Sequence, residues 1–148
     1  MKEELEVRAA TDRARGITLH PVHAVLLAGA LPLFVGALLS DWAYGSTYEV
    51  QWTNFASWLL AGALLLSGFA LLWSVVDLFR ADRRGWRSLT PFLLLLATWV
   101  LGFVNALVHG KDAWATMPEG LILSVIVTVL AVAAIWSAFA RDRAGAVP

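Results

Sequence analysis

The sequence has 148 residues, 11 acidic and 11 basic side chains, and an apolar fraction of 59%. Soluble domains use roughly 45–50% apolar residues, and the mean hydropathy here is +0.71, so the composition excludes an ordinary soluble protein. The chain has no cysteine, which excludes disulfides, thiolate catalysis and Cys-ligated zinc or iron–sulfur sites within this chain.

Residues 1–19 are polar and of mixed charge, and we expect them to form a solvated tail. A cleavable signal peptide would have a short basic start followed directly by an apolar run. The tail has no such pattern, so we expect the first apolar segment to be retained as a span.

Four long apolar stretches follow, at residues 24–40, 55–79, 89–109 and 120–140. A bilayer core about 30 Å thick is crossed by a helix of about 20 apolar residues, and a helix satisfies its own backbone groups in lipid. The sequence therefore predicts an all-α integral membrane protein, an up-down-up-down bundle of four transmembrane helices. One membrane domain would cover residues 20–140, and residues 141–148 would form a C-terminal tail.

Basic residues are distributed unequally between the two sides of these spans. The connections after the first and third stretches contain only Lys111. The two tails and the middle connection contain the other ten: Lys2, Arg8, Arg13, Arg15, Arg80, Arg83, Arg84, Arg87, Arg141 and Arg143. The positive-inside rule then places the N and C termini in the cytoplasm.

Ionisable and amide side chains at membrane depth are rare, and each is a candidate functional residue. They form two groups at opposite ends of the spans. The outer cluster, defined by the ends far from the termini, contains Asp41, Asn54, Asn105, His109 and Asp112. The inner cluster contains His20, His23 and Asp77.

Each cluster has more than one interpretation. The outer cluster could bind a polar ligand, a quinone headgroup or a partner, or it could be a hydrogen-bond network that fixes helix ends. The inner cluster could be a haem b, metal or proton site, or His20 could cap the first span while His23 donates to Asp77 or a carbonyl. His23 and His109 lie at opposite ends, so one chain offers no obvious pair of haem ligands.

Several sequence segments resemble the DUF2231 family of bacterial membrane proteins. They are the segments at 20–23 (HPVH), 52–59 (WTNFASWL) and 105–114 (NALVHGKDAW), with Pro32, Asp41, Asp77, Pro118, Gly120 and Ser124 at matching places. The resemblance covers about residues 19–136. It implies a four-span bacterial inner-membrane protein, with some relatives joined to Rieske-type domains and others found beside periplasmic sugar dehydrogenases.

The sequence contains no recognisable catalytic set, so we expect a non-enzymatic protein. The leading hypothesis is a membrane anchor or electron-transfer subunit for a periplasmic redox partner. The alternatives are a small-solute or proton carrier and a structural scaffold. Expected partners are the lipid bilayer, a periplasmic redox protein and a second copy of the chain, with no nucleic acid.

Overall fold

The computed structural model describes residues 1–7, 19–80, 89–111 and 113–145. These residues contain four long helices: α2 (Pro21–Thr47), α3 (Val50–Arg80), α4 (Leu89–His109) and α5 (Glu119–Gly145). A single 3-10 turn, η2 (Ala113–Thr116), precedes α5. Each long helix contains a segment long and apolar enough to cross a membrane. The predicted all-helical, four-span membrane fold is confirmed.

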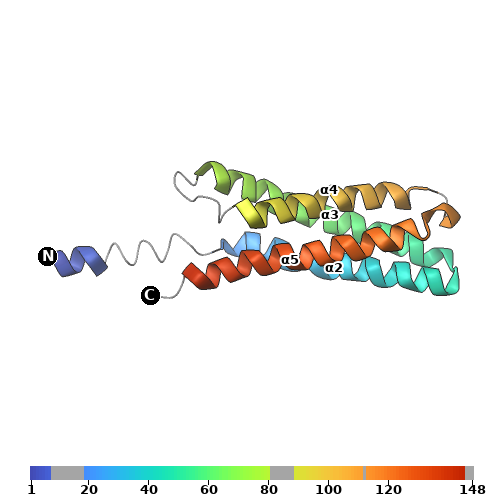
Figure 1. Cartoon of the computed structure of the whole chain (residues 1–148), viewed down its shortest axis with the longest axis horizontal. Coiled ribbons are helices and arrows are strands. Elements are labelled where there is room, and N and C mark those ends of the chain that lie inside the picture. Colours follow the sequence, from blue (N-terminus) through green and yellow to red (C-terminus); the bar gives the residue numbers. More distant parts are fainter. Residues whose placement is uncertain (8–18, 81–88, 112, 146–148) are drawn as a thin grey trace.

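The four helices run side by side, with the α2–α3 and α4–α5 connections at one end and the two termini at the other (Figure 1). Helix α2 packs on α3 and α5, and α4 packs on α5 and α3. We call the end with the α2–α3 and α4–α5 connections the connection end, and the opposite end the terminal end.

Small side chains allow the helices to approach closely. The middle of the bundle buries Ala30, Ala37, Ala63 and Ala131 around Phe34. Nearer the terminal end, a second apolar cluster contains Leu27, Ala70, Leu95, Ala134 and Ala138. Helices in lipid associate through close packing because lipid is as apolar as their side chains, which favours small residues at the contacts.

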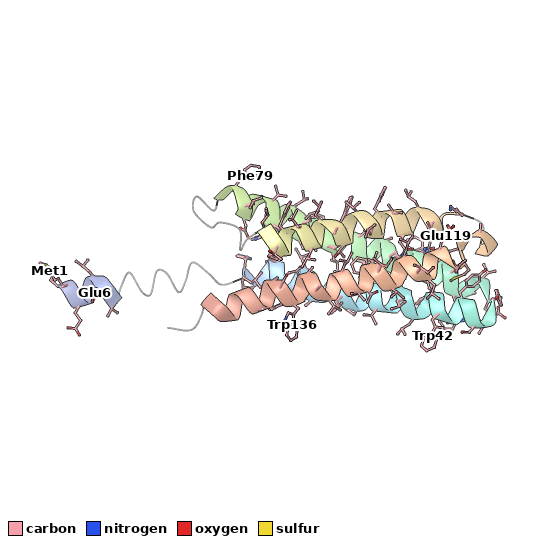
Figure 2. All side chains as sticks on the ribbon, in the orientation of Figure 1. Met1, Glu6, Trp42, Phe79, Glu119 and Trp136 are labelled. Atoms are coloured by element: carbon pink, nitrogen blue, oxygen red, sulfur yellow. The ribbon has the colours of Figure 1, made fainter. Side chains whose placement is uncertain are left out.

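The outer surface of the bundle is apolar. Leu65 and Leu72 are exposed on α3, and Val129 is exposed on α5, each by more than half of its surface. Trp42, near the connection end, and Trp136, in the terminal half, both project outward from the bundle (Figure 2). In water such a surface would drive aggregation, whereas lipid chains cover it without penalty.

The α2–α3 connection is a sharp reversal at Tyr48. This residue adopts a left-handed conformation with φ of 57°, and its backbone N–H donates to the Tyr44 carbonyl at 2.7 Å. A left-handed residue after the last turn is a common way to end a helix. Helix α2 therefore extends to Thr47 before α3 begins at Val50, which is further than the predicted span end at residue 40.

Candidate functional site

Asp41 is the centre of a buried polar network at the connection end. It lies on α2, its side chain is fully buried, and its Oδ1 is 2.7 Å from Nε2 of His109. Its Oδ2 accepts a hydrogen bond from the Ser124 hydroxyl at 2.5 Å. The carboxyl group of α2 is thereby connected to α4 and α5. A buried carboxyl group requires such partners, because desolvation without compensation costs several kcal/mol.

His109 is the last residue of α4, and protein atoms face both of its ring nitrogens. Its Nδ1 lies 2.9 Å from the Asn105 carbonyl oxygen, one turn earlier in the same helix. A carbonyl oxygen only accepts hydrogen bonds, so Nδ1 carries a hydrogen and donates it. The tautomer and orientation of the ring are therefore set by the backbone of α4 on one side and by Asp41 on the other.

Asn105 and Ser124 complete the network. The Asn105 side-chain amide donates to the Ser124 hydroxyl at 2.8 Å, and that hydroxyl donates to Asp41. Four hydrogen bonds thus form a closed ring from Asn105 through Ser124, Asp41 and His109 back to the Asn105 carbonyl. Within the described residues, one buried side-chain atom of these four residues lacks a hydrogen-bond partner, Asn105 Oδ1. We call these four residues the polar ring.

Gly120 leaves space for the His109 ring at the start of α5. A Cβ at this position would lie 2.9 Å from Thr116 Cγ2 and 3.1 Å from His109 Cε1. Real Cβ atoms essentially never approach within 3.0 Å of another atom. A glycine here therefore lets the backbone of α5 approach the imidazole closely enough for Ser124, one turn later, to reach Asp41.

Three of the five predicted outer-cluster residues, Asp41, Asn105 and His109, meet in the polar ring. Asn54 is exposed, while its neighbour Thr53 is the buried residue of that turn. Asp112 lies outside the described residues. Ser124 is the ring member that the sequence interpretation omitted from the cluster, since a single serine in an apolar span is not unusual.

In the part of the chain that the structure describes, no hydrogen bond joins the three inner-cluster residues to one another. His20 is the N-cap of α2: its Nδ1 accepts a hydrogen bond from the Val22 backbone N–H at 3.3 Å, and its ring packs 4.6 Å from the Trp73 ring. His23 is buried with its Nε2 3.2 Å from the Ser74 hydroxyl. Asp77 is exposed one turn further along α3. The sequence left Asp77 or a carbonyl open as partners of His23. In the structure its ring contacts the Ser74 hydroxyl, which donates to the Ala70 carbonyl.

His23 and Asp41 lie near opposite ends of α2. Roughly 27 Å of helix separates the positions of His23 and Asp41, at 1.5 Å per residue. Among the described residues, no group of three or more His, Asp or Glu side chains could hold a metal ion. The histidines at the two ends therefore belong to separate environments, and the polar ring is the better candidate for a functional site.

Comparison with protein families finds a match over most of the chain. The model of the family described as predicted membrane protein (DUF2231) matches residues 19–139, most of the chain. The chain belongs to the DUF2231 family. The matched region contains all four helices through residue 139 and every member of the polar ring. No curated protein and no solved structure matches the chain.

The DUF2231 match and the four apolar helices agree on one conclusion. This is a multi-pass membrane protein with four candidate spans. The polar ring lies within or directly beside three of those spans, at the last turn of α4 and the first turns of α5. Its members are thus at the edge of the apolar layer rather than at its centre.

Proposed function

We propose that this DUF2231 protein is a non-enzymatic membrane subunit of the bacterial inner membrane, which anchors a redox partner on the periplasmic side. The observation that carries the proposal is the polar ring. It joins α2, α4 and α5 at the connection end through side chains whose hydrogen bonds are directed at one another. Such an arrangement fixes the helix ends, as an attachment surface for another protein requires.

The charge distribution supports a periplasmic position for the connection end. Ten of the eleven basic residues lie before the first apolar stretch, between the second and third, or after the fourth, and the positive-inside rule assigns those segments to the cytoplasm. The polar ring and the connections beside it would then lie at the periplasmic face. A soluble redox protein or domain would approach the bundle from that side.

The surface at the connection end suits a docking protein. Trp42, Tyr48 and Trp52 are exposed there, Trp42 by 64%. Tryptophan and tyrosine are enriched both at membrane interfaces and at protein contacts, because they combine a large apolar ring with a hydrogen-bonding group. Glu49 is exposed beside Tyr48, and Lys111 and Glu119 form an exposed ion pair at 3.5 Å.

The association with redox proteins comes from the family resemblance. Some relatives are joined to Rieske-type domains, and others are found beside periplasmic sugar dehydrogenases. This chain has no cysteine, so an iron–sulfur cluster would be supplied by the partner. The proposed subunit holds that partner at the membrane and needs no catalytic residue of its own.

Site-specific photo-crosslinking in the native cells tests the proposal. The crosslinker p-benzoylphenylalanine replaces Trp42 in one variant and Trp136 in the other, since both are similarly exposed tryptophans, one near the connection end and one in the terminal half of the bundle (Figure 2). We expect Trp42 alone to give a crosslinked product whose second component carries a flavin, haem or iron–sulfur chromophore. Products without a redox protein, or the same products from both positions, would refute the proposal.

A further inference from the structure

We propose that Asp41 and His109 form a proton-binding site, which holds one proton in the resting protein and exchanges it with water at the connection end. This inference does not depend on the anchoring role. It follows from counting the hydrogen atoms that the polar ring requires. The ligand is the proton itself, and the site is the contact between Asp41 Oδ1 and His109 Nε2, 2.7 Å apart.

The count begins with the hydrogen bonds on either side of the Asp41–His109 contact. Nδ1 of His109 donates to the Asn105 carbonyl, which has no hydrogen to give. On the other side, the Ser124 hydroxyl accepts from the Asn105 amide and gives its only hydrogen to Asp41 Oδ2. One short contact remains, between Asp41 Oδ1 and His109 Nε2.

That contact needs a hydrogen atom. Without one, a carboxylate lone pair would face an imidazole lone pair at hydrogen-bond distance, which is repulsive. If the hydrogen is on Nε2, the pair is a carboxylate and an imidazolium; if it is on Oδ1, the pair is a carboxylic acid and a neutral imidazole. In both cases the pair holds one proton more than a carboxylate and a neutral histidine.

This proton also balances the charge of the site. The pair with its proton has no net charge, whereas the pair without it has a charge of −1. The Asp41 side chain has no exposed surface and that of His109 has 1%. An isolated charge in such surroundings costs several kcal/mol. The buried site therefore favours the proton-bound form until water or another cation can reach it.

No other described group at this end replaces the proton. On α2 the nearest titratable side chain is the buried Tyr44, three residues after Asp41. The ionisable residues in the sequence of α3, Asp77 and Arg80, are near its C-terminal end, away from this site. Tyr48 and Glu49, between α2 and α3, are exposed. Lys111, which follows α4, and Glu119, the first residue of α5, are more than half exposed and are paired with each other.

The route to water is short on one side only. His109 ends α4, and Gly110 and Lys111, which follow it, are exposed. Toward the terminal end the bundle is filled by the apolar cluster around Phe34. The buried hydroxyls of Ser67, Thr98 and Thr128 donate to backbone carbonyls. Proton exchange is therefore expected with the connection side and not across the bundle.

Nitrogen-15 NMR of the full chain in lipid nanodiscs tests the site. The chain has three histidines, so His109→Gln and His23→Gln variants assign the ring signals. The nitrogen shifts report whether Nδ1, Nε2 or both carry hydrogen. An infrared difference spectrum between wild type and Asp41→Asn detects a protonated carboxyl group. His23, at the opposite end, is the internal control.

The expected result is a protonated Nδ1 on His109 at neutral pH, with the second proton on Nε2 or on the Asp41 carboxyl group. Between about pH 5 and pH 10, a range that starts below the ordinary histidine titration and extends well above it, the pair should lose a single proton as the pH rises. His23 should keep its own titration in Asp41→Asn, while that of His109 should change.

Two results would overturn the proposal, and the wild-type protein alone can give either. An unprotonated Nδ1 on His109 would mean that the pair lacks the additional proton. A proton occupancy that stays constant over the whole pH range would mean that the pair is a static structural contact. Neither result bears on the photo-crosslinking at Trp42, so failure of the proton site and failure of the anchoring role are distinguishable.

Discussion

Replacing Ser124 with alanine should destabilise the bundle far more than replacing another buried serine. The Ser124 hydroxyl donates to the Asp41 carboxyl group and accepts from the Asn105 amide. A hydrogen bond to a charged group contributes about 1.5–3 kcal/mol, and a buried donor left without a partner costs about 1–3 kcal/mol. Membrane measurements give smaller values for single hydrogen bonds, about 0.6 kcal/mol on average. We therefore expect Ser124→Ala to lower the free energy of unfolding by about 2–4 kcal/mol.

Ser67→Ala is the matched control. Ser67 is equally buried, but its hydroxyl donates at 2.6 Å to the Ala63 carbonyl in its own helix. A serine bonded one turn back stabilises a helix little or not at all, so this variant should lose less than about 1 kcal/mol. Unfolding in mixed detergent and SDS, followed by the fluorescence of the eight tryptophans, gives both values. Losses that agree within about 0.5 kcal/mol, the usual additivity error, would refute the role assigned to the ring.

Two further predictions concern the α4–α5 junction and the topology. Gly120→Ala should destabilise the bundle by about 1–3 kcal/mol through overpacking against His109. Gly45→Ala is the control and should be neutral or stabilising, because its Cβ would meet no atom within 4 Å. Equal thermal stability of the two variants would contradict the close approach of α5 to His109. Cysteines placed at Ser46 and Ser88, in a chain with no natural cysteine, should react with an impermeant thiol reagent from the periplasmic side and the cytoplasmic side respectively. Labelling of both from the periplasm would overturn the predicted topology. Ser88 lies outside the described residues.

Hydropathy was sufficient to predict four apolar helices, but the first helix is longer than its apolar stretch. The apolar stretch stops before Asp41, so the predicted span ended at residue 40. In the structure α2 continues to Thr47, because His109 and Ser124 compensate the buried carboxyl group. A charged residue ends an apolar run in sequence, yet it does not end a helix when other helices supply its partners.

The sequence predicted the position of polar residues along each helix better than the helix face on which they lie. Asn54 and Asp41 were placed at similar depth, but Asn54 is exposed and Thr53 is buried. Neighbouring residues in a helix point about 100° apart, and α3 is apolar on every side, so hydropathy did not distinguish its inner face. The same ambiguity explains why Ser74, one turn before Asp77, is the partner of His23.

The position of the polar ring allows its two proposed roles to be separated. Asp41 has two oxygen atoms with different partners, His109 on Oδ1 and Ser124 on Oδ2. Ser124→Ala removes the bond to α5 and keeps the pair that holds the proton. His109→Gln keeps the bond between α2 and α5 and removes the titrating group. If anchoring depends on fixed helix ends, the Ser124 variant should lose partner crosslinking from Trp42 first. If anchoring depends on the state of the proton, the His109 variant should lose it first, and the partner would then sense protonation at the membrane surface.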